Sequence, residues 1–185
     1  MTDERSDVAG QPRPRGGRGG SPAGDGTTLE LPSEQEIVIR RAFDAPAAIV
    51  FEAITRPEHV RRWWAPRSRG EMLVCEVDLR VGGSWRYVMR ANNGMEVGFH
   101  GKFLELDPPT RIVQTEIFDP FPEAVSVVTV TLRAVGERTV LESLIRYPSR
   151  EVRDQVLQTG MEDGMRESYL QLAALVDSLG EVGMP

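Results

Sequence analysis

Hydrophobic and polar residues alternate along several short stretches of the chain, which is the pattern of strands that bury one face. The clearest stretch is 84–90, in which Trp85, Tyr87 and Met89 share one face and polar side chains occupy the other. Further strands are predicted at 36–43, 72–77, 95–106, 111–118, 125–133 and 139–147. Short turns such as Asn92-Asn93-Gly94 join the strands after residue 70, so the sheet is expected to be antiparallel.

Helical spacing occurs in two parts of the sequence. Asp44-Ala45-Pro46 predicts the start of one short helix, and the capping-box pattern Thr55–Glu58 predicts the start of a second. After Pro148, apolar residues recur every three, four or seven positions as far as Leu179, with a break near Thr159 as one interpretation. Only this last helix is long enough to cover an apolar sheet face. We therefore predict an α+β, helix-grip fold: a curved antiparallel sheet of about six or seven strands, two short helices after the first strand, and a long C-terminal helix over the sheet.

Residues 1–33 differ from the rest of the chain in composition. Glycine and proline are frequent there, and the leucines stand only at its end, so the segment has too little apolar surface to offset its ordering entropy. We predict a disordered tail over 1–33 and one folded domain over 34–185. The stretch Pro12–Gly20 resembles an arginine- and glycine-rich arm that binds nucleic acid, but nearby acidic residues favour a solvated leader.

Charge and composition narrow the classes of function. The 185 residues carry a formal net charge of −6, which argues against a general nucleic-acid binder. There is no long apolar run and no secretory signal, so we expect a cytoplasmic protein without a membrane span. Cys75 is the single cysteine, and with His59 and His100 as the only histidines, neither a disulfide nor a zinc site is expected. We expect no cofactor, and no catalytic constellation is recognisable.

Six short segments between residues 36 and 179 carry a resemblance through their order and spacing. They are Phe43–Pro46, Trp63–Pro66, Val81–Arg90, Phe99–Glu105, Pro108–Val113 and Gly160–Met165. Together they resemble the SRPBCC (START-like, helix-grip) superfamily, and within it the branch named after the activator of Hsp90 ATPase.

The resemblance implies a deep pocket between a curved sheet and the C-terminal helix. Members of the superfamily bind lipids, polyketides or other apolar molecules, and some act as cyclases or aromatases. The co-chaperone that gives the branch its name has a separate Hsp90-binding domain, for which residues 1–33 are too short and too polar. Because the family is often dimeric, a homodimer is a further expectation, and fold alone does not settle function.

Large aromatic and thioether side chains suit the wall of an adaptable apolar pocket. The candidate lining residues are Trp63, Trp64, Trp85, Tyr87, Met89, Phe99, Met161 and Met165. Ordinary core packing is the alternative for each of them. The two adjacent tryptophans cannot share one helix face, so we expect one in the core and one at the rim of the pocket.

Three functions fit these features of the sequence. The favoured one is binding of a hydrophobic small molecule in the pocket. An enzyme of the cyclase or hydrolase type would need His100, or a carboxylate beside it, to point inward, whereas strand alternation places His100 opposite Phe99. A co-chaperone-like interaction module would use an exposed surface at Trp63-Trp64.

Overall fold

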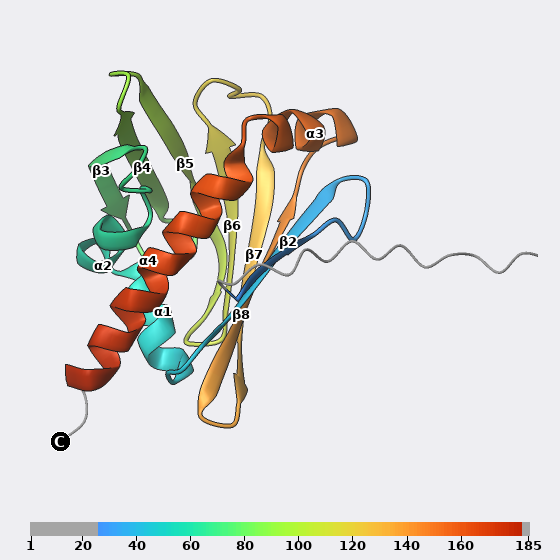
Figure 1. The fold of residues 1–185 in the computed structure, drawn as a ribbon. Helices are drawn as coiled ribbons and strands as arrows, with labels where there is room; N and C mark the ends of the chain where they lie inside the picture. Colours follow the sequence, from blue (N-terminus) through green and yellow to red (C-terminus); the bar gives the residue numbers. More distant parts are fainter. Residues whose placement is uncertain (1–25, 183–185) are drawn as a thin grey trace, which may run out of the picture.

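The computed structural model describes residues 26–182 as a single curved antiparallel sheet with helices on one face (Figure 1). The strands are β1 (Thr27–Glu30), β2 (Glu36–Phe43), β3 (Gly70–Val77), β4 (Ser84–Ala91), β5 (Glu96–Asp107), β6 (Arg111–Phe118), β7 (Ser126–Val135) and β8 (Arg138–Arg146). The helices are α1 (Ala47–Thr55), α2 (Pro57–Trp63), α3 (Arg150–Gln158) and α4 (Met161–Val182). The strand order is β1-β2-β8-β7-β6-β5-β4-β3. This architecture confirms the predicted α+β, helix-grip fold.

Strand β1 corrects part of the tail prediction and brings the sheet to eight strands within the described residues. Residues 27–30 pair with β2 although they were expected to be disordered. Thr27 is buried and accepts a hydrogen bond from Arg41 Nη1 at 2.7 Å, while Leu29 packs against the core. These long-range contacts order a segment whose composition does not favour structure. The remaining tail, residues 1–25, lies outside the described residues.

The C-terminal helical region is divided into two helices at the position where the sequence left a break open. Gly160, between α3 and α4, has φ of 70°, a conformation that glycine adopts without a Cβ penalty. The chain therefore turns after α3, and α4 alone runs diagonally across the sheet (Figure 1).

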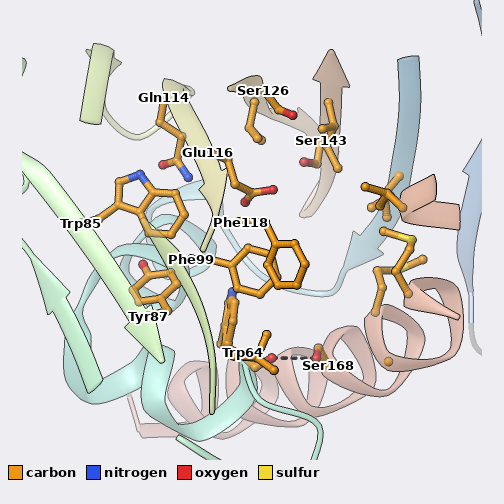
Figure 2. A pocket seen from close by; sticks show the side chains of 18 of the residues that line it. Trp64, Trp85, Tyr87, Phe99, Gln114, Glu116, Phe118, Ser126, Ser143 and Ser168 are labelled. Atoms are coloured by element: carbon orange, nitrogen blue, oxygen red, sulfur yellow. Dashed lines mark hydrogen bonds between the residues drawn. The ribbon is translucent and has the colours of Figure 1, made fainter. Parts of the chain in front are cut away.

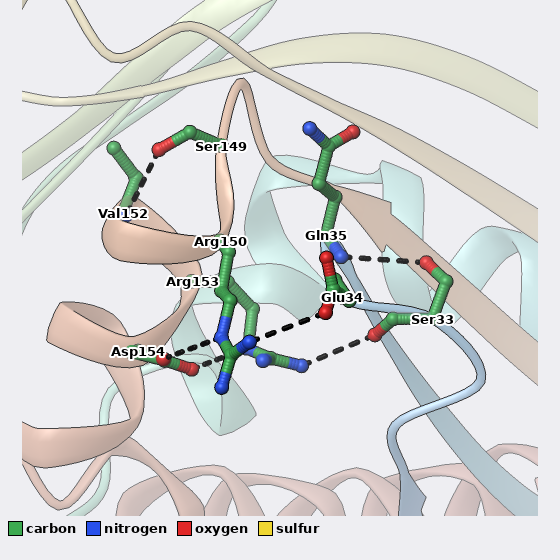
Figure 3. Close-up of polar contacts among 8 residues, drawn as sticks. All are labelled: Ser33, Glu34, Gln35, Ser149, Arg150, Val152, Arg153 and Asp154. Carbon is green, nitrogen blue, oxygen red and sulfur yellow. Dashed lines mark hydrogen bonds and ion pairs between the residues drawn. The ribbon is translucent and has the colours of Figure 1, made fainter.

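Polar contacts fix α3 to the segment that precedes β2 (Figure 3). Ser149 Oγ caps the helix by accepting a hydrogen bond from the Val152 backbone N–H at 3.3 Å. Arg153 is buried, and its guanidinium donates to the Ser33 carbonyl at 3.2 Å and to Asp154 at 2.7 Å. An ion pair between Arg150 and Glu34 adds a further link at 3.2 Å.

The two halves of α4 are packed differently. In the C-terminal half, Leu172 and Val176 are fully buried in a core that includes Val50 and Val60 from α1 and α2. In the N-terminal half, the side chain of Met165 is only half-buried. The C-terminal half of α4 is therefore packed into the core, whereas its N-terminal half is less closely packed. No helix between residues 26 and 182 has the length and apolar character needed to cross a membrane.

Candidate functional site

A cavity of about 780 Å³ lies between the sheet and the helices α3 and α4. Its wall is made by the inward-facing residues of successive strands, which alternate with residues on the outer face. This volume is within the range of roughly 300–1,000 Å³ that is common for small-molecule sites. Most of the lining side chains are aromatic or aliphatic, as Figure 2 shows for part of the wall.

All eight residues that the sequence nominated lie on the cavity wall: Trp63, Trp64, Trp85, Tyr87, Met89, Phe99, Met161 and Met165. They come from four elements, namely the end of α2, strands β4 and β5, and the first turns of α4. The structure thus brings together residues that are far apart in sequence. Their contact with a ligand stays a prediction.

Five of the wall residues form one continuous group of rings, here called the aromatic cluster: Trp64, Trp85, Tyr87, Phe99 and Phe118. Trp64 lies between Tyr87 and Phe99, with ring centroids 5.2 and 5.4 Å away. Phe99 stacks on Phe118 at 4.9 Å, because the two residues are directly opposed on β5 and β6. The sequence pattern did not nominate Phe118, whose strand carries apolar residues on both faces.

The adjacent tryptophans do not divide into one core residue and one rim residue as expected. Both are half-buried and both line the cavity. Trp63 Nε1 donates to the Ala53 carbonyl at 2.9 Å, and its ring packs edge-on against Tyr169 at 6.4 Å. Trp64 instead contacts Tyr87 and Phe99 in the aromatic cluster.

The carboxyl of Glu116, on β6, points into the cavity beside the aromatic cluster (Figure 2). Burial raises its pKa from 4.5 to about 7. Gln114, Ser126 and Ser143 lie on the same part of the wall, but none of them is hydrogen-bonded to the carboxyl (Figure 2). Within residues 26–182 the carboxyl has neither a hydrogen bond nor an ion pair. The sequence pattern did not nominate this residue either. Alternation on β6 places Glu116 on the same face as Ile112 and Phe118, but it does not show that this face is the inner one.

Three phenols from different elements share the cavity wall with this carboxyl. They belong to Tyr87 on β4, Tyr147 after β8 and Tyr169 on α4, and all three line the cavity. Burial raises the pKa of each phenol, and the charge of Glu116 adds to the effect. Apart from Glu123 at the mouth, the described wall therefore carries one carboxyl together with neutral hydroxyl groups.

His100 lies on the outer face of the sheet, opposite to Phe99 as strand alternation predicts. Its Nδ1 is 2.8 Å from Asp119 Oδ1, and Arg86 donates to the other carboxylate oxygen at 3.0 Å. Desolvation opposes ionisation of Asp119, but the hydrogen bonds from His100 and Arg86 outweigh it and keep its pKa below the usual range. The histidine that the enzyme hypothesis named first is therefore not part of the described cavity wall, and Glu116 is the carboxylate that points inward.

The cavity opens where its lining residues become exposed. Phe121 and Glu123 in the loop between β6 and β7 are exposed, as are Gln155 and Thr159 near the end of α3. The loop and α3 thus form the mouth. Among the described residues there is no group of three or more histidine, cysteine or carboxylate side chains that could hold a metal ion.

Several solved structures share this fold. A protein from Rhodobacter sphaeroides is 26% identical, with a TM-score of 0.76, and the match covers 82% of this chain and 99% of that one. A Chromobacterium violaceum protein is 29% identical, with a TM-score of 0.66 and coverage of 77% and 97%. A Mycobacterium smegmatis protein at 24% identity, with a TM-score of 0.72 and coverage of 80% and 96%, shares the fold.

Among proteins with curated descriptions, none matched the chain significantly. Residues 44–177 match the sequence model of one family, the Activator of Hsp90 ATPase homolog 1-like proteins. The match runs from the residues before the first helix, through the sheet, and into the C-terminal half of α4. It therefore includes most of the cavity wall, and the chain belongs to the Activator of Hsp90 ATPase homolog 1-like family, within the SRPBCC fold.

Proposed function

We propose that this protein binds a hydrophobic small molecule in the cavity between the sheet and α4. The observation that carries the proposal is a large, mostly apolar cavity that packing of the side chains leaves unfilled. Proteins of this fold commonly bind hydrophobic ligands, which supports the same assignment. The eight sequence-nominated wall residues are proposed to contact the ligand.

The cavity is too large to remain dry. Cavities left by core truncation in another protein cost about 24 cal/mol per Å³. At that rate an empty space of 780 Å³ would cost on the order of 19 kcal/mol. That exceeds the total stability of about 5–15 kcal/mol that native proteins have. Water or a ligand must therefore fill it, and replacing water on apolar walls stabilises by about 25 cal/mol per Å².

The two alternative functions have less support from the site. An enzyme was expected to use His100 or a carboxylate beside it; His100 lies on the other face of the sheet, whereas the Glu116 carboxyl does line the cavity but has no second catalytic group hydrogen-bonded to it among the described residues. An interaction module was expected to expose Trp63 and Trp64, but both indoles are half-buried and packed against neighbouring rings. The interaction module does not explain the cavity.

Binding of N-phenyl-1-naphthylamine, an uncharged probe whose fluorescence increases in apolar surroundings, tests the proposal. We expect saturable binding of this probe to the full chain. Gly164 lines the cavity, and the three atoms nearest to a Cβ built there all belong to the Arg69 guanidinium, at an ordinary contact distance of 3.5 Å. Gly164→Phe therefore places a ring in the cavity and should weaken probe binding by about tenfold or more, which corresponds to about 1.4 kcal/mol.

The matched control introduces the same ring outside the cavity. Leu170 is on the same helix, is 46% exposed, and does not line the cavity. Leu170→Phe should bind the probe as the unmodified chain does. Absence of saturable binding, or equal affinity in Gly164→Phe and Leu170→Phe, would refute a cavity-binding function.

A further inference from the structure

The carboxyl of Glu116 has no ion-pair or hydrogen-bond partner among the described protein residues, so a bound ligand could supply one. Buried charges in proteins are normally paired, because an isolated charge in an apolar environment is costly. Glu116 keeps some exposure only because it faces the cavity. A ligand in the cavity therefore meets this carboxyl directly.

The surroundings of the carboxyl indicate the sign of the charge that it would meet. The aromatic cluster lies beside it, and the faces of aromatic rings attract cations. The hydroxyl groups of Tyr87, Tyr147 and Tyr169 add neutral hydrogen-bonding atoms. All of these groups suit an ammonium, and a ligand carboxylate would be repelled by Glu116.

The basic residues of the wall point to the same conclusion. Among the described lining residues only Arg69 is basic. Its guanidinium donates to the Gly160 carbonyl at 3.3 Å and lies 3.9 Å from Asp163, at the junction of α3 and α4. The deep part of the cavity therefore has no cation that could pair with an acidic ligand or repel a basic one.

We propose that the cavity selects hydrophobic ligands that carry a protonated amine, with the Glu116 carboxylate as the ionic partner and the aromatic cluster around the ammonium. This inference rests on the proposed binding function and specifies the chemical class of its ligand. The hydrocarbon part of the ligand would occupy the apolar space beneath Met161 and Met165.

Two probes that differ only in the head group test this selectivity. 1-Naphthylmethylamine is a cation at pH 8, and 1-naphthylmethanol is its neutral counterpart. Displacement of N-phenyl-1-naphthylamine at pH 8 should show the amine binding about tenfold or more tightly than the alcohol, in line with a desolvated cation–π contact and an ion pair. The anion 1-naphthoate should bind more weakly than the alcohol.

Glu116→Gln removes the charge and keeps the size of the side chain. We expect its preference for the amine to fall to within about twofold, since each tenfold ratio requires about 1.4 kcal/mol of selective interaction. Glu76→Gln is the matched control, because Glu76 is exposed on β3 and does not line the cavity. It should keep the full preference. Thermal unfolding of both variants establishes that they are folded.

Measurements over a range of pH distinguish the contribution of the Glu116 carboxyl to amine selectivity from that of other charged groups. Below pH 6 the Glu116 carboxyl is largely protonated, so the preference for the amine should shrink several-fold relative to pH 8. The three phenols of the cavity wall stay neutral across this range, because burial raises their pKa values. The other charged lining residues are Arg69 and Glu123, and Glu123 lies at the mouth.

The outcomes distinguish this inference from the binding function itself. Equal affinity of amine and alcohol, a preference for 1-naphthoate, or an amine preference that survives Glu116→Gln would overturn the inference while leaving cavity binding intact. Failure of N-phenyl-1-naphthylamine to bind at all would overturn both.

Discussion

At the scale of the residue, Glu116 is the group whose protonation connects stability to pH. In the unfolded chain its pKa returns to the ordinary value of 4.5, whereas in the folded protein burial raises it to about 7. Between these values the folded protein holds a proton that the unfolded chain has lost. The contribution of Glu116 to stability therefore falls as pH rises through this interval and stays lower above it.

Glu116→Gln should remove this dependence. At pH 8 we expect the variant to be more stable than the unmodified chain by up to about 3 kcal/mol, since each pKa unit corresponds to about 1.36 kcal/mol. At pH 4 both forms carry a neutral side chain there, and the difference should vanish. Urea unfolding at pH 4, 6 and 8 measures it. A variant that is less stable at pH 8, or a difference independent of pH, would contradict the assignment.

Residue alternation located some wall residues and not others, for a physical reason. On β4 the inward residues Trp85 and Tyr87 alternate with polar ones, so the buried face is evident from the sequence. On β6 apolar residues occur on both faces, with Val113 outward and Phe118 inward, so alternation does not show which face Glu116 occupies. Only the pairing of β6 with its neighbouring strands determines which of its faces lines the cavity.

At the scale of the element, α3 depends on its N-terminal cap. Ser149 Oγ accepts a hydrogen bond from the Val152 N–H, which is one of the backbone donors left free at a helix start. Ser149→Ala should destabilise the protein by about 1 kcal/mol, the usual cost of losing such a cap. Thermal and urea unfolding measure the loss, and hydrogen exchange should become faster across Arg150–Gln158.

Ser149→Asp provides the control, because aspartate also caps helix starts. It should retain most of the stability. Equal losses in the alanine and aspartate variants would show that the serine contributes through another contact.

The elements also differ in how far the sequence could predict them. The long strands follow from periodicity. The sequence left a break near Thr159 open, and the structure has it at Gly160, whose φ is positive. Strand β1 has only four residues, and no alternation distinguishes it from the adjoining tail. Its order comes from pairing with β2 and from burial of Thr27, which are interactions with distant parts of the chain.

At the scale of the whole molecule, the cavity results from how α4 is anchored. Its C-terminal half is fixed by Leu172 and Val176, which contact α1 and α2 in the main core. Its N-terminal half lies over the cavity together with α3. The sequence predicts that this helix covers the sheet. The volume of the cavity depends on how far the helix lies from the sheet after both have packed. No local pattern in the sequence determines that distance.

This arrangement predicts unequal local stability along one helix. Backbone amides between 171 and 182 should exchange with solvent more slowly than those between 161 and 170, because the first half of α4 has fewer buried contacts. Saturation with N-phenyl-1-naphthylamine should slow exchange in residues 161–170 and in α3, since bound ligand supplies the missing contacts. At a concentration 100 times its Kd the probe contributes about 2.7 kcal/mol of stability.

Gly164→Phe should protect residues 161–170 without the probe, whereas Leu170→Phe should not, because only the first substitution places a ring in the space beneath the helix. Uniform protection along α4 in the ligand-free protein would mean that the helix packs equally along its length, and the cavity would then not be a stable feature of the fold.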